Sequence, residues 1–240
     1  MTGKIRLDKG VAHGYGLSRS AAASVIRDGL VTVGGEVCTD PAVRIPGDAL
    51  ICYGECSTTP ADTFKKRAFM LNKPPGLVCA NTDGNHPTVL GLFRDETRTE
   101  ALHCAGRLDA NTTGLLVVTD DGSLIHRITS PRKHISKVYL ARTDRDIPQD
   151  AIQAFATGLH HPMERRRYRP VQLEIVEDRL AKVTLSEGRY HEVRRLFECV
   201  GLRVRSLTRI QIGSLALDEG LGSGEYRPLS EGEIELIFKA

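Results

Sequence analysis

The sequence predicts an α+β fold, because many short strand-like segments alternate with few helices. Residues 171–185 alternate apolar and polar side chains on both sides of a short central link, which indicates a β-hairpin. Apolar side chains recur at helical spacing within residues 193–200, which indicates a helix with one buried face. A third signal is the apolar strand that follows the loop containing Asp109.

The N-terminal part reads as a compact module. Ser18 is a candidate N-cap for a helix that continues to Gly29. Two short apolar segments then flank Gly34 and Gly35, a pattern typical of a tight hairpin. The expected organisation is therefore a small α/β domain at residues 1–53, a polar linker at 54–66 and a larger domain at 67–240.

Composition excludes several classes of protein. No apolar run approaches the roughly 20 residues that a membrane-spanning helix needs, and the first residues lack the apolar core of a signal peptide. The six cysteines form no Cys-x-x-Cys pair and no Cys/His cluster with zinc-finger spacing. We therefore expect a cytoplasmic protein with reduced thiols, no metal site and no membrane contact.

The net charge of +3 is mild, but basic residues are grouped. Three basic groups occur, at residues 127–145, 165–169 and 189–209. Each could be a solvated surface, whereas three groups in one domain favour a polyanionic partner, which suggests nucleic acid.

Asp109 lies in a loop that Gly114 closes and that an apolar strand follows. Such an aspartate is commonly a turn residue that accepts backbone N–H groups. It is also well placed to act as a nucleophile or proton carrier. Spacing alone does not separate these two roles.

The segment Gly106-Arg107-Leu108-Asp109-Ala110-Asn111-Thr112-Thr113-Gly114-Leu115-Leu116-Val117-Val118-Thr119-Asp120-Asp121-Gly122 resembles the signature loop of the pseudouridine synthases that act on ribosomal RNA, in the branch that includes the small-subunit (16S) enzymes. The resemblance implies a mixed, mainly antiparallel sheet with flanking helices. It also implies that Asp109 is the catalytic aspartate and that the enzyme uses no cofactor.

Three further segments are similar to motifs of the same family: Lys73-Pro74-Pro75-Gly76, Lys137-Val138-Tyr139 and Glu187-Gly188-Arg189-Tyr190-His191-Glu192-Val193-Arg194-Arg195. The resemblance implies that Tyr139 stacks on the target base and that Arg194 pairs with Asp109. Related small-subunit enzymes often carry Lys at the position of Arg194. The residues expected to bind substrate are Arg107, Leu207, Lys137, Arg189 and Lys73. Arg107 would fill the space of the flipped base, and Leu207, with Ile212 as a rival, would line the base pocket. For Lys73 the resemblance mainly implies packing behind the catalytic loop, with direct RNA contact as the alternative.

The N-terminal module resembles the S4 RNA-binding domain in its Arg-Leu-Asp-Lys start, its Leu-Ser-Arg helix and its Val-x-Val-x-Gly hairpin. The resemblance implies that the module presents basic side chains to structured RNA, and the matching positions are Arg6, Lys9, Arg19 and Arg27. A small packing domain that binds nothing is the alternative.

Together these features predict a monomeric enzyme that converts one uridine of 16S ribosomal RNA to pseudouridine, with its partner the RNA or the assembling small subunit. A large-subunit (23S) synthase and a non-catalytic RNA-binding assembly protein are the alternatives. A hydrolase that uses Asp109 lacks a second carboxylate at suitable spacing.

Overall fold

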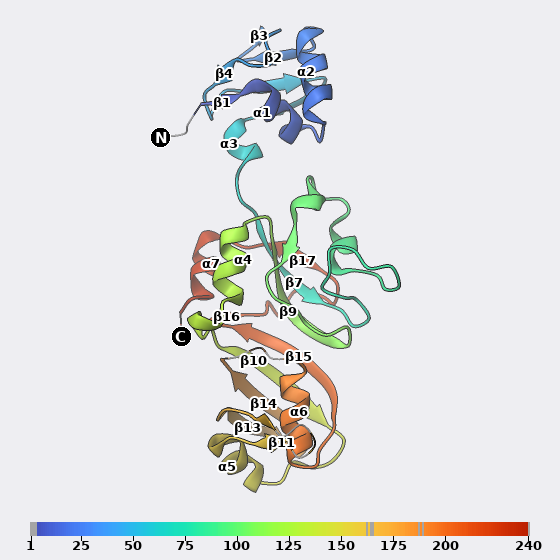
Figure 1. The fold of residues 1–240 in the computed structure, drawn as a ribbon, viewed down its shortest axis with the longest axis vertical. Helices are drawn as coiled ribbons and strands as arrows, with labels where there is room; N and C mark the ends of the chain where they lie inside the picture. The colour runs from blue at the N-terminus through green and yellow to red at the C-terminus, as the bar shows by residue number, and fades with distance from the viewer. Residues whose placement is uncertain (1–3, 162, 164–165, 187, 189, 240) are drawn as a thin grey trace. The chain divides into compact units, whose positions relative to one another are not determined.

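The computed structural model describes residues 4–161, 163, 166–186, 188 and 190–239, and its contacts divide the chain into two compact units (Figure 1). The first unit holds the chain as far as Lys66 together with Glu96–Glu100, and the second holds Arg67–Asp95 and Ala101–Ala240. Every helix in the described ranges is too short or too polar to cross a membrane.

The first unit packs helices on a small sheet around one apolar core. The helices are α1 (Leu7–Gly14) and α2 (Arg19–Arg27), which both contribute to this core, and the short α3 (Pro60–Thr63). The four-stranded sheet has the order β3 (Glu36–Val37), β2 (Val31–Val33), β5 (Ile51–Tyr53) and β6 (Cys56–Thr58), and β1 (Ile5–Arg6) pairs separately with β4 (Arg44–Ile45).

Two local predictions in this unit are confirmed. The Ser18 side chain accepts a hydrogen bond from the backbone N–H of Ala21 at 3.1 Å, so it caps α2. Gly34 and Gly35 both have positive φ angles, 61° and 89°, as a two-residue hairpin turn between β2 and β3 requires.

Residues 54–66 differ from the predicted linker. Part of the segment forms β6, which pairs antiparallel with β5, and α3 follows it. The Tyr15 hydroxyl also contacts the backbone oxygens of Ile51 and Cys56, at 2.8 and 3.2 Å. An edge strand with exposed polar side chains lacks apolar alternation, which explains why its sequence resembles a linker.

The second unit is built on a nine-stranded sheet whose central path is β13-β14-β10-β15-β9-β7-β17, with β16 beside β15 and β8 beside β9 (Figure 1). All but one of the strand pairs in this sheet are antiparallel, so the predicted mixed, mainly antiparallel sheet is confirmed. The strands are β7 (Ala68–Lys73), β8 (His103–Cys104), β9 (Thr112–Thr119), β10 (Lys137–Thr143), β13 (Gln172–Glu177), β14 (Leu180–Leu185), β15 (Val204–Ile212), β16 (Leu215–Ala216) and β17 (Tyr226–Pro228). A separate pair joins β11 (His160–His161) to β12 (Arg166–Arg167).

Helices cover both faces of this sheet. One core includes side chains from α5 (Asp150–Thr157) and α6 (Glu192–Cys199), together with the 3-10 helix η1 (Val89–Phe93). The other includes side chains from α4 (Gly122–Thr129) and α7 (Glu231–Leu236), and two further 3-10 turns, η2 (Thr99–Ala101) and η3 (Pro131–Lys133), complete the unit.

Helix α4 begins shortly after the end of β9. The Asp121 carboxylate accepts the backbone N–H of Ser123 at 2.9 Å and thereby caps the helix. The Arg127 guanidinium then lies 3.9 Å from the centre of the Phe238 ring, so it links α4 to the segment after α7.

The parallel pair β9–β15 joins the Asp109 loop to the C-terminal third of the chain. Thr112 lies opposite Leu207, and Gly114 lies opposite Arg209. Gly114 has a φ angle of +96°, and a Cβ atom at this position would lie 2.2 Å from the backbone oxygen of Arg209. Only glycine therefore permits this approach of the two strands.

We predict that Gly114→Ala lowers the free energy of unfolding by about 2 kcal/mol or more, because it adds backbone strain to an overlap that the sheet cannot relieve. Urea unfolding measures this change. Gly84→Ala is the control, since its Cβ would meet nothing within 4 Å and its φ lies outside the left-handed region. Equal stability of both variants would show that the strands can separate without cost.

Candidate active site

A cavity of about 700 Å³ lies in the second unit, between the Asp109 loop, strands β10 and β15 and the start of α6. This volume is typical of small-ligand sites in proteins. The cavity is lined by side chains of both kinds, apolar ones such as Leu207 and Ile212 and polar ones such as Asp109, Lys137 and Tyr139. The second basic group of the sequence contributes Arg169 to it.

Asp109 is half-buried at the cavity wall, and its carboxylate lies 3.4 Å from Nε2 of His191. The backbone oxygen of Asp109 accepts the N–H of Thr112 at 3.0 Å, which closes a tight turn. The aspartate thus takes part in a turn through its backbone while its side chain remains available to a ligand.

Left-handed backbone conformations gather at this cavity. His134 and His191 have φ angles of 48° and 54°, and Gly106 has a φ angle of 95°. All three line the cavity, and non-glycine residues in this conformation tend to occur at functional sites. The turn at His191 directs its imidazole toward Asp109. The Tyr190 ring stacks on this imidazole, with 3.8 Å between the two ring centres.

Lys73 supports the Asp109 loop from behind. Its side chain is fully buried, and Nζ donates to the backbone oxygens of Pro74, Ala110 and Thr112 at 2.9–3.1 Å. Burial lowers the pKa of this ammonium group. Lys73 thus packs behind the loop, as the resemblance mainly implies, and its charge serves backbone carbonyls on either side of the loop.

A pair of thiols supports the other side of the loop. The backbone N–H of Leu108 donates to Sγ of Cys79 at 3.4 Å. The Cys104 thiol interacts with the same sulfur, and this interaction is the main cause that lowers the pKa of Cys79. The same interaction with Cys79 raises the pKa of Cys104. Asp109 is thus preceded by an anchored backbone N–H and followed by the carbonyls that Lys73 binds.

Two cations lie at the base of the cavity. Burial, reinforced by the charge of Arg209, lowers the pKa of Lys137 to about 8, and nearby Glu192 opposes the shift. The Lys137 ammonium donates to the backbone oxygen of Ile135 at 3.0 Å. Arg209 is only 2% exposed, and its Nε donates to the backbone oxygen of Leu115 at 2.8 Å.

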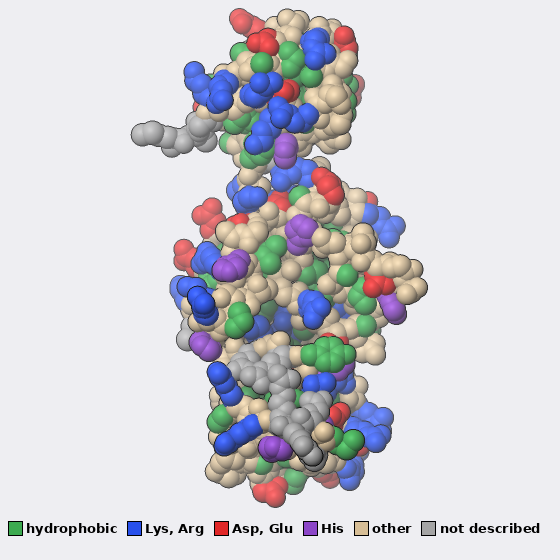
Figure 2. Space-filling model, viewed as in Figure 1, with side chains coloured by type: hydrophobic (Ala, Val, Ile, Leu, Met, Phe, Trp, Pro, Cys, Tyr) green, Lys and Arg blue, Asp and Glu red, His purple; other side chains and the backbone are tan. Residues whose placement is uncertain are grey.

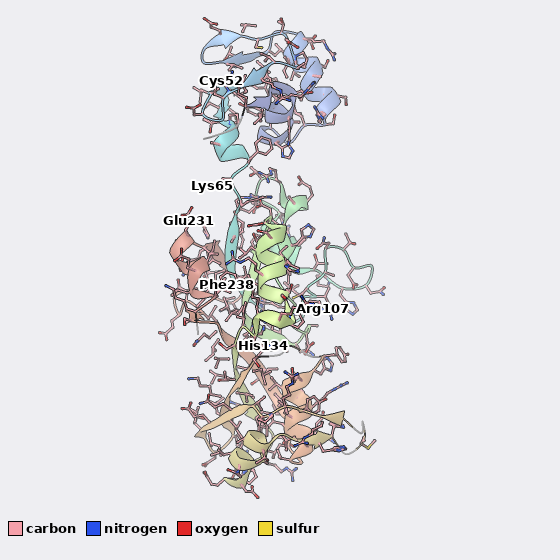
Figure 3. The ribbon with its side chains drawn as sticks, turned by 60° about the vertical axis from the view of Figure 1, so that its left-hand side comes forward. Cys52, Lys65, Arg107, His134, Glu231 and Phe238 are labelled. Atoms are coloured by element: carbon pink, nitrogen blue, oxygen red, sulfur yellow. The ribbon has the colours of Figure 1, made fainter. Side chains whose placement is uncertain are left out.

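Five of the eight predicted residues of this site line the cavity, and Figure 3 labels one of them, Arg107, together with His134 near α4. The five are Asp109, Tyr139, Arg107, Leu207 and Lys137. Ile212, the rival of Leu207, also lines it. Arg189 lies outside the described residues.

Arg194 does not pair with Asp109, which corrects the sequence-based expectation. Its Nη1 donates to the backbone oxygen of Val204 at 2.9 Å, and the residue is outside the cavity lining. The reason is the helical geometry of α6, which places Arg194 toward the start of β15. His191 precedes the first turn of α6 and takes the place beside Asp109.

Sequence reasoning also missed Thr112, His134 and Arg209 as cavity residues. Thr112 and Arg209 meet only through the pairing of β9 with β15, which no local pattern indicates. The unusual backbone of His134 and His191 has no signal in the sequence either, since glycine or asparagine is the usual residue there.

The four basic residues predicted to bind RNA in the first unit are exposed. Arg6 and Arg19 both bind the carboxylate of Asp8, at 2.9 and 2.8 Å, and the hydrogen bond from Arg6 is the main cause that lowers the pKa of Asp8. Lys9 lies 5.2 Å from the centre of the Phe64 ring. Figure 2 shows Lys and Arg side chains on the visible face of each unit.

Comparison with known proteins follows the same division of the chain. Residues 67–199 match the family model described as RNA pseudouridylate synthase, and residues 5–51 match the S4 domain. A solved structure described as the crystal structure of pseudouridylate synthase superposes with a TM-score of 0.68 at 41% identity. It covers 97% of this chain, and the chain covers 99% of it.

Curated relatives match over nearly the whole length. The chain is 44% identical over 233 residues to the ribosomal small subunit pseudouridine synthase A of Salmonella typhimurium and to that of Escherichia coli, with 97% of this chain and 100% of each relative covered. The protein of the same name from Haemophilus influenzae is 42% identical over 235 residues, with 98% and 100% covered. With a site that presents an aspartate, a tyrosine and basic side chains in one cavity, the chain belongs to the RNA pseudouridylate synthase family.

Proposed function

We propose that the protein converts a specific uridine of 16S ribosomal RNA to pseudouridine, with Asp109 as the catalytic carboxylate. The observation that carries the proposal is the half-exposed Asp109 carboxylate in a cavity that also presents Tyr139 and several cations. The choice of the small-subunit RNA rests on curated relatives that carry that name at 42–44% identity over their full length.

The reaction breaks the N1–C1′ bond of the uridine, turns the base and joins C1′ to C5. The C5 proton is then removed, and N1 gains a proton. Asp109 acts on the sugar, either by adding covalently to C1′ or by removing the C2′ proton on a glycal path. His191 lies close enough to orient the Asp109 carboxylate and to stabilise the negative charge of that carboxylate. Tyr139 stacks on the base and is the group that removes the C5 proton.

The target uridine must leave its stack to reach the cavity, at a cost of a few kcal/mol. Arg107 is exposed at the rim and would occupy the space that the base vacates. The cations Lys137 and Arg169 offset part of the cost through attraction to phosphates. At neutral pH, Lys137 is mostly charged, because its pKa of about 8 lies above that pH.

The domain assignment is part of this proposal. Residues 67–240 carry out the reaction, and the N-terminal S4 domain binds the structured RNA through Arg6, Lys9, Arg19 and Arg27. Two of these, Arg6 and Arg19, are held together by Asp8 yet keep their side chains 45% and 61% exposed, so a phosphate can approach both. The expected enzyme acts as a monomer in the cytoplasm, where ribosomal RNA is assembled.

We predict that the protein releases tritium from C5-labelled uridine in a 16S transcript or in a partly assembled small subunit, and that Asp109→Asn reduces this release at least about a thousandfold. RNA affinity and the unfolding midpoint stay unchanged, because the side chain is 34% exposed and its polar contact among the described residues is a long one, 3.4 Å to His191.

Asp178→Asn is the control for this variant, since Asp178 is an exposed carboxylate in the β13–β14 link. No release by the well-folded wild-type protein on either RNA substrate would refute the proposed reaction. Equal loss of RNA binding and turnover in Asp109→Asn would instead assign a structural role to the residue.

For the S4 domain, we predict that Arg19→Gln weakens binding of 16S RNA. The plot of log affinity against log salt should fall less steeply, its slope smaller in magnitude by about one, as expected when one phosphate contact is lost. Turnover at saturating RNA stays the same. The control is Arg179→Gln, an exposed arginine in the second unit that pairs with Asp146. An unchanged salt slope for Arg19→Gln would favour a packing role for the first unit.

A further inference from the structure

Two buried polar atoms in the cavity have no hydrogen-bond partner among the described residues. They are Oγ1 of Thr112 and Nη2 of Arg209. Both residues are 2% exposed, and both line the cavity beside Asp109. Leaving such a group unpaired costs about 1–3 kcal/mol, and native proteins rarely do so. Two such groups in residues that line one cavity indicate that a bound ligand, reached by a small turn of each side chain, completes their hydrogen bonds.

The sheet brings these two atoms to the same face. Leu207 and Arg209 are two residues apart on β15 and so point to one side, and Thr112 lies opposite Leu207 on β9. The bond from Arg209 Nε to the Leu115 oxygen holds the guanidinium over β9. On the other side of β15, Arg209 is the direct neighbour of Tyr139 on β10.

Position relative to Asp109 favours a base over a phosphate as the ligand. The carboxylate must reach C1′, the sugar atom to which the base is attached, and Thr112 closes the turn that holds Asp109. Groups beside Asp109 and Tyr139 therefore face the base itself. Arg169 also lines the cavity but is exposed, so it suits the charged backbone better.

The hydrogen-bonding chemistry of the pair selects among bases. An arginine N–H can only donate, whereas a threonine hydroxyl can donate or accept. Uracil presents a carbonyl oxygen next to the N3–H group, so O4 accepts from Arg209 while N3–H donates to Thr112. Cytosine has an amino group in place of O4 and lacks the proton on N3. Its amino hydrogens would face the Arg209 donor.

We propose that Thr112 and Arg209 form a subsite that reads the O4 and N3–H edge of the flipped uracil and rejects cytosine. This inference rests on the proposed function, because it assumes that a uridine enters the cavity. Sites built to hydrogen-bond a substrate group discriminate strongly against analogues that lack it, since their own buried groups then remain unpaired.

The test uses Thr112→Val in the full-length protein. Valine has nearly the shape of threonine, and Oγ1 has no partner in the free protein, so stability stays the same or rises. We expect kcat/KM for tritium release from 16S RNA to fall about tenfold, as for the loss of one hydrogen bond. Thr113→Val is the matched control, because its hydroxyl already bonds Thr208 Oγ1 at 2.8 Å and lies outside the cavity lining. It should lower stability and leave turnover largely intact.

A second measurement does not depend on turnover. Nuclear magnetic resonance titration compares the binding of uridine and cytidine 5′-monophosphates, with inorganic phosphate as a competitor. The wild type should prefer the uridine nucleotide about tenfold or more, and Thr112→Val and Arg209→Lys should narrow the preference. Such a preference without tritium release would refute the proposed reaction and retain the subsite.

Three results would overturn the subsite. The first is that Thr112→Val leaves both the preference for the uridine nucleotide and kcat/KM unchanged. The second is equal binding of the two nucleotides with full competition by phosphate, which would assign the two groups to the RNA backbone. The third is the absence of nucleotide binding to the well-folded protein.

Discussion

The site depends on one contact between strands, the parallel pairing of β9 with β15 at Gly114 and Arg209. Leu115 and Arg209, which share a hydrogen bond there, are separated by 94 residues in the chain. The pairing sets the Asp109 turn beside Leu207 and Arg209, and β10 adds Tyr139 from the other side of β15. A side chain larger than hydrogen at residue 114 would overlap the Arg209 backbone. The pairing of the two strands and the cavity beside it therefore both require glycine at this position.

The loop that carries Asp109 is rigid for reasons that lie behind the cavity rather than in it. Lys73 binds three carbonyl groups around the loop, and Cys79 accepts the N–H of Leu108 just before the aspartate. Supporting groups of this kind hold a catalytic side chain in its productive geometry without contacting substrate. The arrangement leaves the cavity wall to groups that can meet a ligand, and it gives the buried Lys73 a structural role.

Features with strong local signals could be predicted from the sequence. The Ser18 cap, the Gly34-Gly35 turn and the helix within residues 193–200 follow from residues near one another in the chain. The partner of Asp109 could not be predicted in this way. His191 reaches it through a left-handed turn before α6, whereas the motif pointed to Arg194, three residues later on the helix. The role of Arg209 depends on strand pairing across the sheet, which leaves no periodic pattern.

The central claim is that this cavity receives one nucleotide out of the RNA stack and sets its sugar against Asp109. A crystal structure of the Asp109→Asn protein bound to a 16S RNA fragment tests it most directly. The account predicts a flipped uridine whose C1′ lies beside residue 109, whose ring stacks on Tyr139, and whose former place in the RNA is filled by Arg107. An RNA bound with every base still stacked, or a flipped base held away from Tyr139, would contradict it.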